Sequence, residues 1–206
     1  MSEYPKRGRE RFKQYKMIIL FFVFIIKVMP LGLRKTFFEW SRFFNGLFGI
    51  IIRYILLKSI AISCGDNVAV FQGVYILNPE NIRIGNNVSI HPMCYIDAGG
   101  EINIGNDVSI AHNVTIMSSS HIYSDIDIPL KDQEVVFSTT NIEGDVWIGA
   151  KATITYGKNI GSGVVIGAGS VITKDCVSNG IYVGIPARRI KERIKDENCN
   201  SNFNIQ

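Results

Sequence analysis

A chain of 206 residues with 47% apolar residues is long enough for one globular domain with an additional segment, and too short for several domains. Residues 1–60 carry 12 Lys and Arg against 3 Asp and Glu, a net charge of +9, whereas residues 61–206 carry 10 against 15, a net charge of −5. This division favours an anionic membrane surface as a partner. It argues against nucleic acid, because the acidic body has no basic patch interleaved with aromatic residues.

Residues 1–60 are predicted to form a basic, apolar helical segment. The apolar run 17–26 follows six cations, as in a signal peptide, but no small-residue cleavage site comes after it, so we do not expect secretion. Ten residues also fall short of the roughly 20 that span a bilayer. From Phe37 to Ile60, apolar residues recur at three- and four-residue steps, which predicts an amphipathic helix. This helix is either an interfacial membrane anchor or a cap on the following domain, and both roles are compatible.

Residues 61–187 show a six-residue period led by isoleucine. The clearest run of lead residues is Ile142, Ile148, Ile154, Ile160, Ile166 and Ile172. Three repeats close one triangular coil of about 18 residues, which is the sequence signature of a β-helix. The lead side chains should point inward and stack about 4.8 Å apart. The glycines that follow lead residues are Gly85, Gly105, Gly149, Gly161 and Gly167. At these positions we expect the chain to bend into dihedral angles that glycine tolerates best.

A polar insertion interrupts the repeat between Ile116 and Ile142. Loop 117–141 is expected to project from the coil, and loops on rigid scaffolds commonly carry function. Beyond the coil, residues 188–206 are predicted to form a short charged helix and a tail. The four cysteines, which form no CxxC pair, are expected to be reduced core fillers, as suits the cytosol. They are Cys64, Cys94, Cys176 and Cys199.

Several motifs, in order along the chain, resemble those of the hexapeptide-repeat acetyltransferases. They are "IGNDVSIAHNVTIMSSSH", "DIPLKDQ", "IEGDVWIGAKATI", "VIGAGSVITKD" and "VGIPARRI". The resemblance covers roughly residues 62–191 and is specific to the sugar O-acetyltransferases of surface polysaccharide synthesis, with their galactoside and maltose acetyltransferase relatives. It implies a left-handed parallel β-helix, a homotrimer with sites between subunits, acetyl-CoA as co-substrate and a saccharide hydroxyl as acceptor.

The resemblance places the catalytic histidine at His121, the last residue of "SSSH". An imidazole suits this role, because a sugar hydroxyl is a weak nucleophile and a base that titrates near neutral pH can take its proton. By an ungapped count, His91 matches a substrate-contacting position of galactoside acetyltransferases, although a plain surface histidine fits this position equally well. Asp97 is a candidate to orient His121 or a sugar hydroxyl.

For acetyl-CoA, the resemblance implies contacts along the later coils. Trp147 matches the family tryptophan beside the pantetheine arm, and Ala150 and Ala168 match positions whose small side chains let the CoA chain lie close. The positions matched to nucleotide contacts are Thr173, Lys174, Arg188 and Lys191. Cationic side chains suit the phosphate-rich end of this ligand.

The sequence is also compatible with functions outside sugar O-acetylation. A γ-type carbonic anhydrase shares this coil, but the resemblance to that class implies two zinc-binding histidines five positions apart. Here His91, His112 and His121 are separated by 21 and 9 positions, and no metal is expected. An amino-sugar N-acetyltransferase, an antibiotic acetyltransferase and a noncatalytic membrane-docked scaffold stay open as well.

We expect a cytoplasmic protein at the inner face of the membrane, in peripheral contact through residues 1–60. Nothing in loop 117–141 identifies the acceptor sugar.

Overall fold

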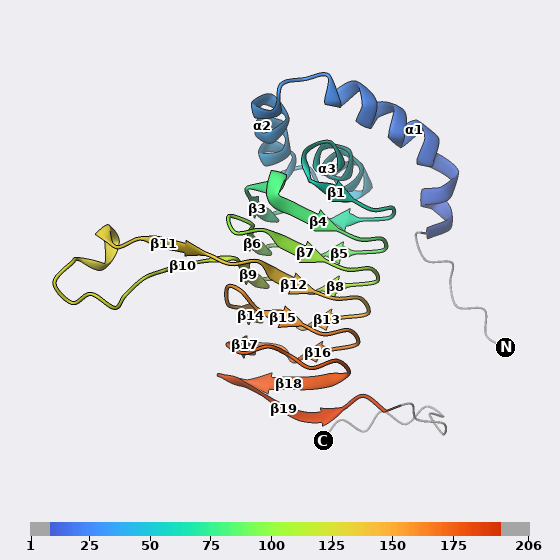
Figure 1. Ribbon diagram of the computed structural model, residues 1–206. Helices are drawn as coiled ribbons and strands as arrows, with labels where there is room; N and C mark the ends of the chain where they lie inside the picture. The colour runs from blue at the N-terminus through green and yellow to red at the C-terminus, as the bar shows by residue number, and fades with distance from the viewer. Residues whose placement is uncertain (1–8, 195–206) are drawn as a thin grey trace.

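The computed structural model describes residues 9–194, and its body is a left-handed parallel β-helix (Figure 1). Successive coils pair in parallel with their lead residues in register, as in Ile90 with Ile110 and Ile110 with Ile148. The β-helix predicted from the six-residue period is therefore confirmed.

Most coils contribute one short strand to each of three sheets. Sheet 1 contains β1 (Ser63–Cys64), β4 (Ile82–Ile84), β7 (Ile102–Ile104), β12 (Thr140–Ile142) and β15 (Asn159–Ile160). Sheet 2 contains β2 (Ala69–Val70), β5 (Ser89–Ile90), β8 (Ser109–Ile110), β13 (Trp147–Ile148), β16 (Val165–Ile166), β18 (Gly180–Gly184) and β19 (Ala187–Glu192). Sheet 3 contains β3 (Tyr75–Leu77), β6 (Tyr95–Asp97), β9 (Thr115–Met117), β14 (Thr153–Ile154) and β17 (Val171–Ile172).

The interior is a column of isoleucines. In sheet 2, Ile90, Ile110, Ile148 and Ile166 follow one another in paired strands and are all fully buried. Small residues four positions after a lead residue, such as Ala152 after Ile148, are also buried and fill the remaining interior space. Replacing one of the buried isoleucines with alanine removes packed volume that the rigid coil cannot recover, at a cost of about 2–5 kcal/mol.

The glycines after the lead residues serve close packing between coils, and the dihedral-angle explanation for them was wrong. A Cβ added to Gly85 would lie 2.7 Å from the carbonyl carbon of Gly105, and one added to Gly149 would lie 2.6 Å from the amide nitrogen of Ala168. Positive φ angles occur instead two residues further on, at Asn87 (58°) and Lys151 (59°). Glycine is required here because the backbone of the next coil leaves no room for a side chain.

Three helices cover the first coil: α1 (Arg9–Lys27), α2 (Leu31–Ser41) and α3 (Gly46–Ile60). The single helix predicted from Phe37 to Ile60 was wrong, because residues 42–45 separate α2 from α3. Gly46 has a φ of +68°, which permits the sharp turn into α3. No helix within residues 9–194 is both long enough and apolar enough to cross a bilayer.

Helix α3 is anchored to the coil through a buried arginine. The Arg53 side chain is 1% exposed, and its Nε donates a hydrogen bond of 2.8 Å to the carbonyl oxygen of Val70 in β2. Its Nη1 donates to the carbonyl oxygens of Ser41 and Phe44, at 2.6 and 2.8 Å. Arg53 thus ties the turn between α2 and α3 to the first coil.

Two antiparallel features depart from the coil. Strands β10 (Ser119–His121) and β11 (Val135–Phe137) pair in a projecting arm, and the short 3₁₀ helix η2 (Leu130–Asp132) lies between them near its tip (Figure 1). A second 3₁₀ helix, η1 (Pro79–Asn81), lies between β3 and β4. At the other end, β19 pairs antiparallel with β18. The predicted helix beginning at residue 188 was therefore wrong over residues 188–192, because these residues complete sheet 2; residues 195–206 lie outside the described part of the chain.

Candidate functional site

The arm is fixed at its root by Asp97, the last residue of β6. One carboxylate oxygen of Asp97 accepts a hydrogen bond from the Ser119 hydroxyl, and the other accepts one from the Gly99 amide at 3.1 Å. The Asp97 carbonyl oxygen accepts a further bond of 2.6 Å from the Ser118 hydroxyl. Asp97, a residue singled out from the sequence, therefore connects the second coil to the first residues of the arm.

His121 is the last residue of β10 and is exposed on the arm. It pairs with Val135 of β11, and Ser119 pairs with Phe137. Because side chains alternate along a strand, Ser119 and His121 lie on the same face of β10 and Ser120 lies on the other. The imidazole is accessible to a substrate and is held on a strand whose root is bonded to Asp97.

His91 lies at the end of β5 in sheet 2, across the width of sheet 3 from Asp97. Its ring stacks on Phe71, with the ring centroids 4.8 Å apart. Partial burial lowers the pKa of His91, and the nearby His112 lowers it further, so the neutral ring predominates at neutral pH. Within residues 9–194 no three His, Cys, Asp or Glu side chains are grouped so that they could hold a metal ion.

One group of predicted CoA residues lies across the outer face of sheet 2 and at its junction with sheet 3. Pairing places Trp147 beside Val165, Val165 beside Ile181 and Ile181 beside Lys191, a line of about 14 Å for three steps between strands. The indole of Trp147 is 55% exposed. Ala150 and Ala168 occupy the junction one coil apart, where the Gly169 amide donates to the Ala150 carbonyl oxygen at 2.8 Å.

Arg188 also belongs to this group, since it pairs with Val183 in β18 and is exposed. Two exposed cations, Arg188 and Lys191, therefore lie at one end of a surface that carries an exposed indole at the other. Between them the small side chains of Ala150 and Ala168 leave the backbone accessible. This arrangement can accommodate an extended ligand with an anionic end.

The other group lies where sheet 3 ends. Register places Asp97, Met117, Thr155 and Thr173 one above another, and Lys174 follows Thr173. Thr173 and Lys174 are exposed. From Ala168 to Thr173 the chain crosses sheet 3, a distance of roughly 16 Å at 3.3 Å per residue. A single chain thus carries the predicted site residues along two separate edges of sheet 3.

The arm, predicted as a polar loop, also exposes large apolar side chains. Ile126 is 95% exposed, and Leu130 and Phe137 are exposed as well. The arm is nevertheless ordered internally, because the Gln133 amide nitrogen donates to the carbonyl oxygens of Asp125 and Ile128 at 2.7 and 2.9 Å. An ordered arm with apolar residues on its surface is suited to packing against another protein surface.

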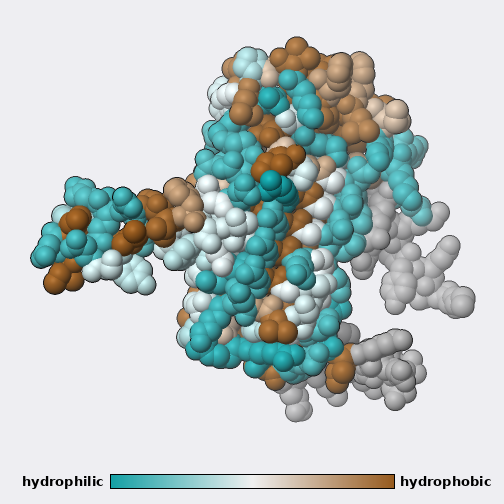
Figure 2. Space-filling view, in the orientation of Figure 1, coloured by the Kyte–Doolittle hydropathy of each residue, from teal (hydrophilic) through white to brown (hydrophobic). Residues whose placement is uncertain are grey.

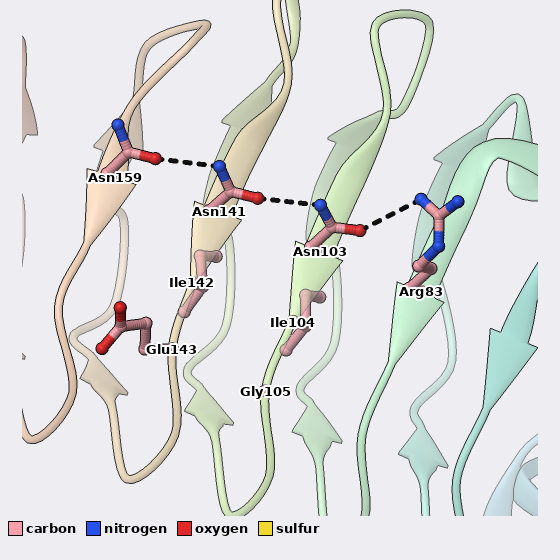
Figure 3. Close-up of a pocket in the computed structure, with 8 residues that line it drawn as sticks. All are labelled: Arg83, Asn103, Ile104, Gly105, Asn141, Ile142, Glu143 and Asn159. Carbon is pink, nitrogen blue, oxygen red and sulfur yellow. Dashed lines mark hydrogen bonds between the residues drawn. The ribbon is translucent and has the colours of Figure 1, made fainter.

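A shallow groove on sheet 1 contains none of the predicted site residues (Figure 3). Along it, Arg83 donates to the side-chain oxygen of Asn103, Asn103 to that of Asn141, and Asn141 to that of Asn159. Each asparagine precedes a lead isoleucine, a recurrence in the sequence that could have predicted this ladder. The ladder joins neighbouring coils, and we assign it no chemistry.

The described cysteines are free and unsuited to chemistry. Burial raises the pKa of the thiols of Cys64 and Cys176 to about 12, and it also raises the pKa of Cys94. Such thiols carry little thiolate at neutral pH. Cys199 lies outside the described residues.

The chain is similar in structure and sequence to known acetyltransferases. A maltose O-acetyltransferase from Clostridium difficile 630 is 30% identical with a TM-score of 0.69, covering 82% of this chain and 89% of that one. A galactoside acetyltransferase in complex with coenzyme A is 32% identical with a TM-score of 0.69, covering 77% and 78%. No protein-family model matches the chain.

Among curated relatives, a chloramphenicol acetyltransferase from Morganella morganii is 52% identical over 52 residues. That match spans a quarter of this chain and a quarter of the relative.

Proposed function

The chain belongs to the hexapeptide-repeat acetyltransferases, and from that premise we propose that it transfers an acetyl group from acetyl-CoA to a saccharide hydroxyl. The observation that carries this proposal is the exposed His121 on an arm whose root is bonded to Asp97. The maltose and galactoside acetyltransferase relatives support a sugar as the acceptor.

His121 is the general base of this mechanism. Its imidazole takes the proton of the acceptor hydroxyl as the oxygen bonds to the acetyl carbonyl carbon. Acetyl-CoA supplies the acetyl group as a thioester, whose carbon–sulfur bond breaks in the same transfer. The proton held by His121 then passes to the departing thiolate, which leaves the base ready for another cycle. Asp97 keeps the arm, and therefore the base, in position.

The residues that would hold acetyl-CoA fit such a ligand. Trp147, Ala150 and Ala168 form a surface with an exposed aromatic ring and little side-chain bulk, which suits an extended apolar chain. Thr173, Lys174, Arg188 and Lys191 supply hydroxyl and cationic groups for phosphates.

The working assembly in this proposal is a homotrimer. His121, Asp97 and Lys174 lie along one edge of sheet 3, whereas Trp147 and Arg188 lie beyond its other edge. One chain in isolation therefore separates the base from half of the cofactor surface, and a neighbouring copy reunites them. The exposed apolar side chains of the arm would be covered by the same contact.

We further propose that the enzyme works in the cytoplasm at the inner face of the membrane, through peripheral contact of residues 1–60. Their net charge of +9 supports attraction to anionic lipid. His91, neutral at neutral pH, is proposed to contact the acceptor through its ring nitrogens.

The test is acetyl transfer itself. Incubation with labelled acetyl-CoA and a panel of soluble and lipid-linked saccharides should yield a labelled, base-labile ester. An amide product would instead indicate an amino-sugar N-acetyltransferase. No transfer to any saccharide, with wild-type protein that binds CoA, would contradict the proposed acceptor.

An antibiotic acceptor is the second candidate, because the chloramphenicol acetyltransferase matches 52 residues at 52% identity. Chloramphenicol belongs in the same panel. Transfer to chloramphenicol at a higher kcat/KM than to any saccharide would favour the antibiotic as the acceptor.

A further inference from the structure

Apolar residues gather over the three-helix cap, α1 to α3, on the side away from the coil (Figure 2). On α1, Met17 and Phe24 are 78% and 71% exposed; Trp40 on α2 and Phe48 on α3 are 65% and 68% exposed. Each helix also buries an apolar residue on its inner face: Val23, Phe38 and Leu57. The outer surface is therefore additional to what closing the coil requires, and exposed apolar side chains that gather in one place mark an interaction site.

This surface is rigidly attached to the coil. Besides the Arg53 bonds, the Tyr54 hydroxyl donates to the carbonyl oxygen of Gly65 at 2.9 Å. Lys16 of α1 forms an ion pair of 2.5 Å with Asp66, and Lys35 of α2 forms one of 2.7 Å with Glu80. Whatever binds the outer surface of the cap therefore also fixes the direction of the coil.

The charge around the cap favours anionic lipid. Lys13 and Lys27 are exposed on α1, next to the apolar run that carries Met17 and Phe24. An apolar helical surface with aromatic residues and flanking cations is the chemistry of a helix lying in the interface of a bilayer. A soluble partner would have to supply both a large apolar surface and acidic groups, whereas an anionic bilayer presents both.

The position of the arm along the coil sets its height above such a surface. The arm leaves the coil after β9, two steps below β3 in sheet 3, or about 10 Å at the spacing between strands. The cap adds roughly another helix diameter of about 10 Å. Figure 1 shows the arm projecting sideways from the coil, with the cap over one end.

We propose that the outer surface of the cap docks flat on an anionic bilayer and holds His121 about 20 Å above it, so that the acceptor is a saccharide anchored in that bilayer. This inference rests on the proposed acetyl transfer to a sugar. It adds that the cap selects the membrane-bound form of the acceptor by position and leaves the chemistry at His121 unchanged.

Docking is tested first, with vesicles of equal parts phosphatidylcholine and phosphatidylglycerol. Phe21 lies on α1 like Phe24 and is 60% exposed. The wild-type chain should sediment with the vesicles, and the double variant Phe21→Glu, Phe24→Glu should lose at least tenfold in apparent binding. Val177→Glu is the control, because it makes one such apolar-to-glutamate change at a residue 66% exposed in the last coil, away from the cap. Trp40→Ala, a milder change on α2, should weaken binding without the risk of misfolding.

Selection of the acceptor is tested with two galactosides, methyl galactoside in solution and hexadecyl galactoside held in the vesicles. The Phe21→Glu, Phe24→Glu variant should acetylate the anchored acceptor about tenfold more slowly than wild type and the soluble one at an unchanged rate. Equal losses on both acceptors would overturn the inference, because the cap would then act on the site itself.

Other results assign the surface differently. A wild-type chain that ignores the vesicles, or a double variant that binds them equally well, overturns docking. If the double variant instead dissociates a larger wild-type assembly in light scattering, a second copy of the chain covers the cap. If wild type acetylates neither galactoside, galactose is excluded as the acceptor sugar, and sedimentation alone decides whether the cap docks.

Discussion

The hydroxyl of Ser119 donates a hydrogen bond to the carboxylate of Asp97, across 22 positions of sequence. This bond fastens the first residue of β10 to the coil, two residues before His121 on the same face of the strand. The Ser118 hydroxyl reinforces the attachment through the Asp97 carbonyl oxygen. The proposed base is therefore positioned by a bond made elsewhere on the arm.

Ser119→Ala should lower kcat by about tenfold, because a small displacement of a positioned base reduces the fraction of productive geometry. The KM for acetyl-CoA should stay near its wild-type value, since the partner of the Ser119 hydroxyl is Asp97, which is not a predicted CoA residue. Ser119→Thr keeps the hydroxyl and should restore most of the rate. Ser120→Ala is the control, because Ser120 faces the other side of β10. Equal rates for Ser119→Ala and Ser120→Ala in steady-state kinetics would remove the positioning role.

The sequence predicted the β-helix correctly because inward packing in such a coil imposes a six-residue spacing on residues such as Ile148 and Ile154. Features that depend on contacts between coils were harder to predict from the sequence. The need for Gly149 comes from Ala168 in the next coil, 19 positions away, and no local preference encodes that approach. The hydrogen bond from Ser119 to Asp97 is non-local in the same way.

Local signals explain the other differences. The Asn45–Gly46 pair is a common turn dipeptide and could have predicted the break between α2 and α3. The charged stretch from Arg188 to Glu192 has good helix formers, but pairing with β18 outweighs that preference. The order of residues in the sequence did not show that the site residues divide between two edges of sheet 3. That division depends on where each coil turns from one sheet into the next.

His121→Ala should lower kcat by about two to four orders of magnitude, the range expected when a general base is removed. Binding of CoA, measured by calorimetry, should change little, because His121 lies on the arm and away from the predicted nucleotide contacts. His112→Ala is the matched control, since His112 is an exposed histidine at a turn of the coil. Near-wild-type turnover of His121→Ala would exclude this residue as the base.

The double variant Lys174→Ala, Arg188→Ala should raise the KM for acetyl-CoA more than it lowers kcat, because both cations are proposed to contact the nucleotide, remote from the reacting atoms. Lys151→Ala removes one exposed cation from a turn of the coil and should leave this KM unchanged. An unaltered CoA affinity of the double variant in calorimetry would refute the assignment.

Arg53→Ala should lower the free energy of unfolding by about 2–5 kcal/mol, because it removes three hydrogen bonds to carbonyl oxygens and leaves a cavity beneath α3. Burial also lowers the pKa of Arg53, so the charged group is held in the fold by its hydrogen bonds despite the cost of desolvation. Arg83→Ala is the control and should cost about 0–1 kcal/mol, since the Arg83–Glu101 pair is exposed. Urea unfolding followed by circular dichroism measures both, and equal losses would contradict the anchoring role.

Coexpression of two inactive variants tests the shared site directly. In the proposed trimer, one chain supplies His121 and its neighbour supplies Trp147 and Arg188. A mixture of His121→Ala with the double variant Trp147→Ala, Arg188→Ala should therefore recover activity, about a quarter of the wild-type value if subunits mix at random in a cyclic assembly.

His121→Ala mixed with Asp97→Ala is the control: both changes lie at the same edge of sheet 3, so no combination should rebuild an intact site. Light scattering should give about three times the 23.1 kDa chain mass for each mixture. Recovery in both mixtures, or in neither while the trimer forms, would show that the site residues are not divided between chains in this way.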